Sequence, residues 1–289
     1  MASKNKNIRA FRYFGSHWIE TLRDKRFKLA KPSELNDPFD CVGAYTGNIP
    51  RSVAKANARR LVDSEYSKEC YRDLPRKEKR AEKDRKLKEI QKVYKKKFQD
   101  LVSKASEEKT GMDEAIRLLC MSCPVQHVRD DVSFNMAEVL MWSHYADNHH
   151  GVRVGITMPL GVKNIRVLPV EYTGNRPLHD WSVSQDLAES DFILKVALTK
   201  SPAWIYENEI RLIASPKCCK SDLLEDGSRA SFLTFETNVI SRVDFGLLME
   251  PDEEDECIEL LNKDYPHVEV YKAKYHPTEY RLDYQPIKR

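Results

Sequence analysis

The chain has 289 residues, of which 41% are hydrophobic and 32% are charged, and its formal net charge is +3 at pH 7. This length allows one large domain or two small ones with a buried core, and the composition is that of an ordinary soluble protein. No apolar run approaches the roughly 20 residues that a membrane-spanning helix needs. Residues 1–10 are polar and basic, which is unlike a secretory signal. We therefore expect a cytoplasmic protein that crosses no membrane.

The first forty residues predict a strand, a helix, a second strand and a loop. The strand covers residues 11–14, the helix runs over about 16–23, and residues 26–30 alternate between apolar and polar side chains as a strand does. Residues 31–40 contain two prolines and the turn-forming pair Asn-Asp, so we expect a loop there.

Residues 51–118 predict helix almost throughout, with breaks near Pro75 and Gly111. Within this block, residues 76–97 hold twelve lysines and arginines against four acidic residues. Apolar side chains recur there every three or four positions, which indicates an amphipathic helix with one buried stripe. Its basic side is either a solvated face or a surface that meets the phosphates of a nucleic acid or a protein acceptor.

The remainder of the chain mixes strands and helices without a regular strand–helix alternation. Strands are predicted at residues 118–123, 151–158, 165–172, 203–215, 231–235, 240–248 and 268–274, and helices at 134–147, 186–198 and 253–263. This mixture favours an α+β fold with a central, mostly antiparallel or split sheet over a doubly wound sheet. We expect a single domain over residues 1–289, with residues 51–118 as a helical insertion or lid.

Several common functional motifs are absent. No G-x-G-x-x-G opens a helix, and the sequence has no phosphate loop, no H-E-x-x-H and no G-x-S-x-G. The seven cysteines are scattered, which favours a reducing compartment. Cys120 and Cys123 form one C-x-x-C pair, but a structural zinc site usually needs two such pairs. We therefore expect no bound metal.

The first group of candidate site residues lies in the segment 206–211. If this segment is a strand, Glu207, Glu209 and Arg211 share one face. One interpretation is an amphipathic strand that carries a ladder of ion pairs on the surface. The other is that one carboxylate faces a cleft and stabilises an oxocarbenium-like ribose carbon, while the second orients an acceptor or takes its proton. Arg211 would then hold a pyrophosphate or pair with Glu209.

A second group lies on the helix predicted at 134–147. Trp142 and Tyr145 belong either to the core or to a site where an aromatic ring stacks on a flat heterocycle such as nicotinamide. His144 either belongs to the same cofactor-binding site or is a hydrogen-bonded structural residue, and it lacks the spacing to a second ligand that a helical metal site needs.

A third group combines the first strand with the proline-bounded loop. Arg12 and Tyr13 lie on the strand, and Ser33, Asn36 and Asp37 lie on the loop. The loop residues either form a structural turn, for which asparagine and aspartate are well suited, or hold the ribose or phosphates of a nucleotide together with Arg12.

Four blocks of the sequence resemble a bacterial family catalogued as domain of unknown function 2971 (DUF2971). They are residues 29–41 (LAKPSELNDPFDC), 140–155 (LMWSHYADNHHGVRVG), 204–213 (WIYENEIRLI) and 243–280. The blocks follow the order of the family and span nearly the whole chain outside 51–118. Leu35 replaces a phenylalanine of the family pattern and Ile210 replaces a tryptophan, and both exchanges keep an apolar side chain. The resemblance implies kinship of fold without a reaction.

The order of these features is also similar to the layout of the ADP-ribosyltransferases. That resemblance implies that Arg12 or Tyr13 holds the ribose of NAD and that Tyr145, with Ser143, flanks nicotinamide. It implies further that Glu209 is the catalytic carboxylate and that Glu207 is the preceding acid of an E-x-E pair.

The function implied by the second resemblance is NAD-dependent ADP-ribosyl transfer or NAD glycohydrolysis, with NAD as the substrate and no metal. Such a protein would act as a phage-defence or toxin-like effector. Two other hypotheses stay open. One is a non-catalytic module of a defence system that binds a nucleotide, or nucleic acid through the basic helix 76–97, and the other is a nuclease whose clustered acids hold two metal ions.

Overall fold

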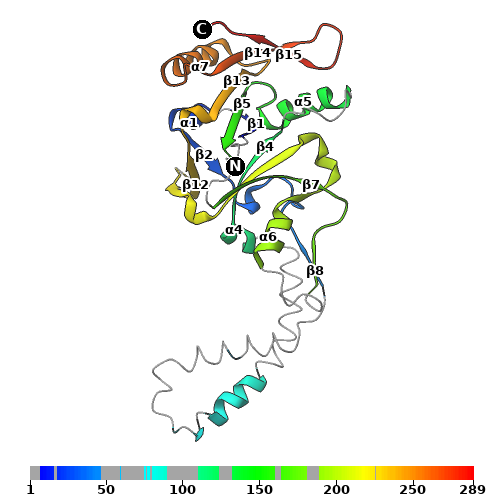
Figure 1. The fold of residues 1–289 in the computed structure, drawn as a ribbon, viewed down its shortest axis with the longest axis vertical. Helices are drawn as coiled ribbons and strands as arrows, with labels where there is room; N and C mark the ends of the chain where they lie inside the picture. Colours follow the sequence, from blue (N-terminus) through cyan, green and yellow to red (C-terminus); the bar gives the residue numbers. More distant parts are fainter. Residues whose placement is uncertain are drawn as a thin grey trace, which may run out of the picture. The chain divides into compact units, whose positions relative to one another are not determined.

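The computed structural model describes part of the chain, and that part forms two compact units (Figure 1). The described residues are 7–15, 18–46, 59, 75, 77–78, 80–89, 110–123, 132–159, 164–180, 189–224 and 226–289. The main unit comprises Met1–Asp40, Met112–Gly174 and Leu198–Arg289, and the second unit comprises Cys41–Gly111 and Asn175–Ala197.

The main unit is built on an eight-stranded sheet with the strand order β15-β14-β13-β5-β1-β4-β10-β6. The strands are β1 (Asn7–Phe14), β4 (Arg117–Ser122), β5 (Val152–Pro159), β6 (Ile165–Pro169), β10 (Glu209–Ala214), β13 (Ile240–Phe245), β14 (Glu269–Tyr275) and β15 (Leu282–Pro286). Among these strands, β13 and β14 pair in parallel and all other neighbours pair antiparallel. The structure therefore confirms an α+β fold with a mixed, mostly antiparallel sheet.

Smaller elements surround this sheet. In the main unit they are α1 (Trp18–Arg23), β2 (Arg26–Leu29), η1 (Pro32–Glu34), α5 (Val132–Tyr145), β7 (Glu171–Tyr172), β9 (Thr199–Lys200), η3 (Pro202–Glu207), η4 (Pro216–Cys218), β11 (Lys220–Leu223), β12 (Arg229–Thr234), η5 (Thr237–Val239) and α7 (Pro251–Asp264). A helix α4 (Thr110–Ala115) precedes β4. The second unit contains a parallel pair of β3 (Ala44–Thr46) and β8 (Leu178–Asp180), together with α6 (Glu189–Ala197).

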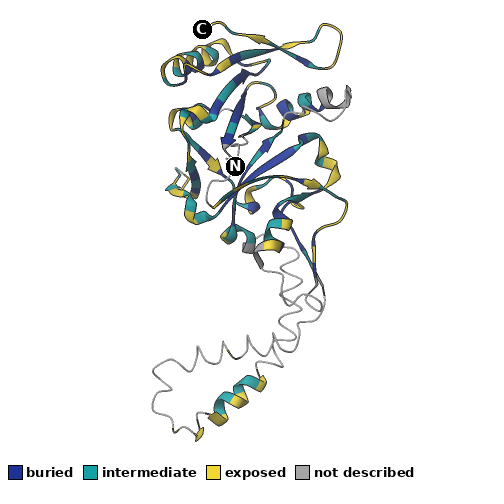
Figure 2. Cartoon of the chain, viewed as in Figure 1, coloured by how far each residue is buried: buried dark blue, intermediate teal, exposed yellow. Residues whose placement is uncertain are grey.

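The main apolar core contains residues of the sheet together with residues of α1 and α7. Figure 2 colours the chain by how far each residue is buried. Helix α7 begins with Pro251 and has three acidic residues in its first turn, where the positive end of the helix dipole favours negative charge. Cys257 and Leu261, four residues apart, are the residues of this helix that are fully buried. Trp18 and Leu22 have the same spacing on α1 and are buried in the same cluster.

The sheet opens between β1 and β4. β1 pairs with β5 over eight residues, whereas it pairs with β4 at one position, Phe11 opposite Ser122. Farther along β4, Leu118 instead forms an isolated bridge with Ala30, which follows β2. The two halves of the sheet therefore diverge beyond Phe11, and side chains of both strands border the space between them.

A tight turn joins α5 to β5 and fixes where the helix delivers its side chains. Three consecutive residues, 147–149, have positive φ angles, and Gly151 follows them. A Cβ atom on Gly151 would lie 1.9 Å from the carbonyl oxygen of Phe14, so glycine is required at this position. The turn thereby holds the C-terminal end of α5 close to the end of β1.

One predicted element is wrong in its first half. The strand expected at 203–215 is the 3-10 helix η3, a left-handed residue Asn208, and only then the strand β10. Ser201 caps η3 and Pro202 occupies its first turn, so the chain starts a helical turn there although its pattern alternates. The predicted helical insertion at 51–118 falls mainly outside the described residues, although residues 80–89 are helical. Among the described helices, none is long and apolar enough to cross a membrane.

Candidate functional site

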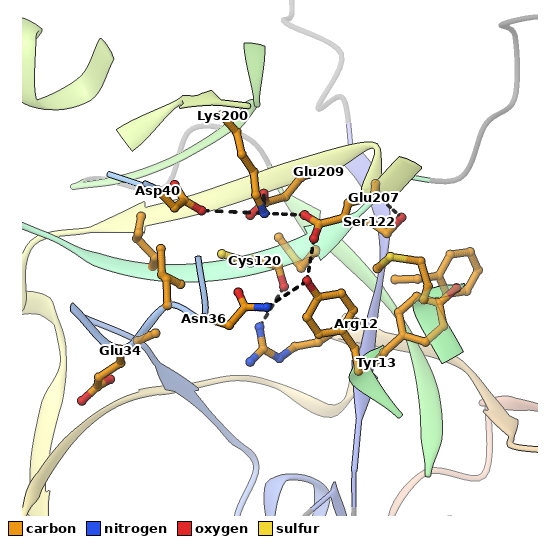
Figure 3. A pocket seen from close by; sticks show the side chains of 17 residues that line it. Arg12, Tyr13, Glu34, Asn36, Asp40, Cys120, Ser122, Lys200, Glu207 and Glu209 are labelled. Atoms are coloured by element: carbon orange, nitrogen blue, oxygen red, sulfur yellow. Dashed lines mark hydrogen bonds and ion pairs between the residues drawn. The ribbon is translucent and has the colours of Figure 1, made fainter. Parts of the chain in front are cut away.

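A cavity of about 290 Å³ lies where β1 and β4 diverge (Figure 3). Its walls come from β1, the loop 30–40, β4, α5, β9, η3 and β10. Arg12, Tyr145 and Glu209, which are far apart in the sequence, all line this one cavity. The segments singled out in the sequence therefore converge in the main unit.

Lys200 lies at the centre of a cluster of carboxylates on one wall. Its Nζ atom is 2.5 Å from Oε2 of Glu207, 3.1 Å from Oε2 of Glu209 and 3.7 Å from Oδ2 of Asp40. Figure 3 shows these side chains pointing toward one another beside the cavity. Nearby carboxylates outweigh the effect of burial, so the pKa of Lys200 is raised and its ammonium stays charged.

Arg211 holds the other side of this cluster. Its guanidinium contacts both oxygens of Asp40, at 2.9 and 2.6 Å, and both oxygens of Glu209, at 2.7 and 3.0 Å. Such bidentate contacts fix the planes of both carboxylates. The pKa of Arg211 is raised, because Cys120, Glu209 and Asp40 together overcome the effect of burial.

The cluster is buried and not electrically balanced. The side chains of Glu207, Glu209 and Arg211 are 5%, 4% and 0% exposed, so they are not a surface ion ladder. Among the described residues, three carboxylates face two cations in these contacts, so the cluster carries one excess negative charge when all three carboxylates are ionised. Buried ion pairs of this kind are costly to desolvate and are therefore poor evidence of a purely stabilising role.

Glu207 reaches the cluster because of the turn that follows it. Asn208 has φ of 43° and ψ of 54°, and its side-chain amide donates to the carbonyl oxygen of Cys123 at 2.8 Å. The hydroxyl of Ser122 donates to the carbonyl oxygen of Glu207 at 2.6 Å. These bonds hold η3 against the end of β4, so that Glu207 and Glu209 both face the cavity although only Glu209 lies on a strand.

The two glutamates differ in their electrostatic state. Burial raises the pKa of Glu207 and Glu209 adds to this effect, whereas Lys200 and the hydroxyl of Tyr145 partly counteract it. Burial also raises the pKa of Glu209, but the contacts of Glu209 with Arg211 and Lys200 have the larger effect and lower its pKa to about 2. Glu209 is therefore ionised at neutral pH, and Glu207 is the carboxylate whose protonation is more easily changed.

Tyr145 connects the cavity to Glu207. Its hydroxyl donates to Oε1 of Glu207 at 2.5 Å and accepts from the side-chain amide of Asn36 at 3.4 Å. Burial and the neighbouring carboxylate raise the pKa of Tyr145, so its hydroxyl keeps its proton and remains a donor. Asn36 and Tyr145 thus extend the hydrogen-bonded network from the cluster across the cavity.

Arg12 is the one cation lining the cavity that makes no contact with a carboxylate in the described part of the chain. One terminal nitrogen donates to the carbonyl oxygen of Cys120 at 2.8 Å, and the guanidinium lies over the ring of Phe14 at 5.2 Å. Its Nε atom is shielded from solvent and has no hydrogen-bond partner among the residues that the structure describes. Burial lowers the pKa of Arg12, and the neighbouring Cys120 and Glu209 only partly counteract this effect.

Other candidates from helix α5 lie elsewhere. Trp142 is fully buried, and its indole N–H donates to the hydroxyl of Tyr284 at 2.9 Å, so it is a core residue. Ser143 donates to the carbonyl oxygen of Val139, four residues earlier. His144 is exposed and its Nδ1 atom lies 3.1 Å from the hydroxyl of Tyr206. None of these three α5 residues lines the cavity.

The loop and strand candidates divide in the same way. Tyr13 and Asn36 line the cavity, whereas Ser33 and Asp37 do not. Ser33 donates to the carboxylate of Asp113 at 2.5 Å, and Asp37 accepts from the backbone N–H of Phe39 at 2.8 Å, as in a structural turn. Arg211 is too deeply buried in its ion pairs to contact a pyrophosphate, so its pairing with Glu209 is the observed arrangement.

Two residues that complete the cluster, Asp40 and Lys200, were not among the site residues predicted from the sequence. The sequence of β10, where Arg211 stands among apolar residues, indicated that acidic partners exist, but it did not indicate Lys200. A buried arginine requires carboxylate partners, and more than one is usual when its five donors are satisfied. Asp40 lies in a block that also contains Asn36 and Asp37, so it was the natural additional candidate.

Within the described residues, no group of three histidine, cysteine, aspartate or glutamate side chains is arranged to hold a metal ion. The three clustered carboxylates are instead bridged by Lys200 and Arg211. Cys120 and Cys123 are both free thiols.

Comparison with known proteins supports the family resemblance. Residues 141–212 match the family model described as "Protein of unknown function (DUF2971)". This segment begins at the end of α5 and includes Tyr145, Lys200, Glu207 and Glu209. No curated protein and no solved structure matches the chain.

Proposed function

We propose, on the premise that this chain carries the DUF2971 domain over residues 141–212, that its cavity binds NAD and transfers the ADP-ribosyl group to an acceptor or to water. The observation that carries this proposal is the buried cluster with one excess negative charge, whose carboxylate Glu207 lines the cavity. A preorganised negative charge favours a reaction in which positive charge develops on the substrate.

Cleavage of the bond between nicotinamide and ribose is such a reaction. The bonding electrons leave with nicotinamide, which departs as a neutral molecule, and the positive charge moves onto the ribosyl group. Glu207 would stabilise this charge through the oxygen atoms that it presents to the cavity. The attacking water or acceptor hydroxyl loses a proton as it bonds to the ribose carbon, and Glu207, whose pKa is raised, is suited to accept that proton.

We assign the catalytic role to Glu207, although the resemblance to the transferases implies Glu209. Both oxygens of Glu209 are engaged by Arg211, and Oε2 also contacts Lys200. Glu207 has one contact on each oxygen, from Tyr145 and from Lys200, and so retains more capacity to interact with a substrate. In this proposal Glu209 positions Lys200, which in turn orients Glu207.

Arg12 and the size of the cavity support a ligand of this chemical class. The cavity is close to the lower end of the range of about 300 to 1,000 Å³ that small-molecule sites occupy, which suits one nucleoside half of a dinucleotide. The guanidinium of Arg12 has donor capacity that the described residues do not use, and a phosphate group would satisfy it.

The proposal is tested by incubating the full chain with NAD and measuring free nicotinamide, with and without candidate protein and nucleic-acid acceptors. We expect nicotinamide to accumulate, and transfer of label from adenine-labelled NAD identifies an acceptor. The variant Glu207→Gln keeps the size of the side chain and should release nicotinamide at least about 100-fold more slowly. Equal rates for the two proteins would remove Glu207 from the mechanism.

A second outcome distinguishes the alternative function. If NAD protects the protein from thermal unfolding but no nicotinamide appears, the cavity belongs to a non-catalytic nucleotide-binding module. A role as a phage-defence or toxin-like effector is part of the proposal, because consumption of NAD arrests a cell. For this role, expression of the wild-type chain must lower cellular NAD, and expression of Glu207→Gln must leave it unchanged.

A further inference from the structure

The main unit contains a second cavity, of about 380 Å³. The polar residues that line it differ from those that line the first cavity. It is lined by β1, β5, β13, β14 and the 3-10 helix η5. Phe11 lines both cavities, but none of Arg12, Glu207 or Glu209 borders the second one. Its chemistry must therefore be argued from other side chains.

Strand register explains why a cavity forms at this place. Phe11, Gly155, Arg242 and Glu269 are paired in succession across four neighbouring strands, so they form one row across the sheet. Gly155 contributes no side chain to this row, and a Cβ atom there would lie 3.0 Å from Cβ of Arg242. The register of β13 also shifts between Ile240 and Arg242, as at a β-bulge, which re-aims the side chains nearby.

Two arginines, Arg9 and Arg242, border this cavity and have side-chain donors that no described residue uses. Arg242 donates from Nε to Asp244 at 2.6 Å and lies over the ring of Tyr271 at 3.8 Å, so its position is fixed. Its terminal nitrogens form no hydrogen bond to any residue that the structure describes. Arg9 lies two residues before Phe11 on the same face of β1, and it is exposed.

The remaining polar residues suit a ligand that also carries hydroxyl groups. His267 contacts the carbonyl oxygen of Ile240 through Nε2 at 3.1 Å, which leaves its Nδ1 atom for a ligand. Glu269 is the one carboxylate among the described residues that line the cavity, and it accepts a hydrogen bond from the hydroxyl of Tyr271 at 3.4 Å. A carboxylate at this position repels an anion but accepts hydrogen bonds from sugar hydroxyls.

We propose that the second cavity binds a small phosphorylated sugar, with its phosphate on Arg9 and Arg242 and its hydroxyls on Glu269. Two guanidinium groups supply parallel N–H donors that match the oxygens of a phosphate. The pairing of Arg242 with Asp244 and its stacking on Tyr271 hold one of these groups in place before the ligand arrives.

The test is isothermal titration of the full chain with ribose 5-phosphate, and with ribose as the control probe. We expect ribose 5-phosphate to bind and ribose to bind at least about tenfold more weakly, since the charge-assisted hydrogen bonds are lost. Arg9→Gln and Arg242→Gln should each weaken binding of ribose 5-phosphate by about tenfold or more. Arg9 is exposed, so this variant remains informative if Arg242→Gln proves unstable.

Two control variants separate this site from the first cavity and from general charge effects. Arg12→Gln alters only the first cavity, and Arg23→Gln removes an exposed arginine that pairs with Glu256. Both should leave the affinity for ribose 5-phosphate unchanged. The proposal would be overturned if ribose 5-phosphate did not bind or if ribose bound equally well. It would also be overturned if Arg12→Gln or Arg23→Gln weakened binding of ribose 5-phosphate while Arg9→Gln and Arg242→Gln did not. Nicotinamide release plays no part in this test, so the two proposals succeed or fail separately.

Discussion

Glu207 and Glu209 are two positions apart in the sequence and meet the same lysine, yet their environments give them different properties. The contacts with Arg211 and Lys200 lower the pKa of Glu209, whereas burial raises the pKa of Glu207. A pair of carboxylates whose pKa values move in opposite directions is a common feature of sites that divide electrostatic and proton-transfer roles. In the proposed site, Glu209 therefore positions the other side chains of the cluster, and Glu207 interacts with the substrate.

The lowered pKa of Glu209 predicts a specific dependence of stability on pH. The pKa of about 2 in the folded chain compares with an ordinary value of 4.5, which corresponds to about 3 kcal/mol of stability. Since the folded pKa is depressed, this contribution is present above about pH 4.5 and is lost as the pH falls toward 2. Glu209→Gln should lower the unfolding free energy at pH 7 by about 3 kcal/mol and flatten its dependence over this range.

Urea unfolding at a series of pH values between 7 and 3 measures this effect. The matched control is Glu256→Gln, because Glu256 forms an exposed ion pair with Arg23 and should change the unfolding free energy by less than about 1 kcal/mol. A Glu209→Gln variant with an unchanged pH profile would contradict the assigned role of the cluster.

The hydroxyl of Tyr145 should matter more to activity than to stability. Tyr145→Phe removes a hydrogen bond to Glu207 at the border of the cavity, so we expect a stability loss of about 1 kcal/mol. Nicotinamide release should fall by at least about tenfold, because Glu207 loses one of the two groups that orient it. Tyr275→Phe, which alters an exposed tyrosine, is the control for both assays. An unaltered rate in Tyr145→Phe would show that this hydroxyl has no part in the reaction.

At the scale of elements, the turn at Asn208 determines the site more than the strand beside it. Sequence alternation correctly predicted that Glu209 and Arg211 share a face of a strand. It did not predict that Glu207 precedes that strand in a 3-10 helix, because the turn depends on a tertiary hydrogen bond between Asn208 and Cys123. Periodicity reports which face a residue occupies and carries no information about such contacts.

Other elements show the same division between local and tertiary signals. The strand at the start of the chain, helix α7 and the helix–turn–strand around Gly151 follow from local patterns and were predicted. The partners Asp40 and Lys200 were not, because Asp40 lies in a turn and Lys200 in a two-residue strand, where no periodic pattern indicates burial. The widening between β1 and β4 also depends on the pairing of distant strands.

Substitutions of Asn208 test the role of this turn. Asn208→Gly keeps a residue that adopts the left-handed conformation and removes only the hydrogen bond to Cys123, so about 1 kcal/mol of stability should be lost. Asn208→Val also places a branched side chain in the left-handed region, which costs about 1 to 2 kcal/mol more. Chemical unfolding of both variants, with nicotinamide release as the second assay, should show valine as the more damaging change. Equal effects would mean that the conformation of residue 208 does not position Glu207.

At the scale of the whole molecule, ligand binding should appear as a change in global stability. A ligand that binds only the folded state at 100 times its dissociation constant adds about 2.7 kcal/mol. NAD should therefore raise the thermal unfolding midpoint of Glu207→Gln, in which the substrate is not consumed. The additional change Arg12→Gln should abolish most of this increase, since Arg12 is the cation in the cavity lining that contacts no carboxylate of the described residues. An equal increase in both variants would place NAD outside this cavity.

The decisive measurement compares nicotinamide release from NAD by the wild-type chain and by Glu207→Gln, at equal protein concentration and with folding verified by circular dichroism. We expect steady release by the wild-type protein and a rate at least about 100-fold lower in the variant. A folded wild-type chain that releases no nicotinamide, or a variant that releases it at the wild-type rate, would show that Glu207 does not cleave NAD.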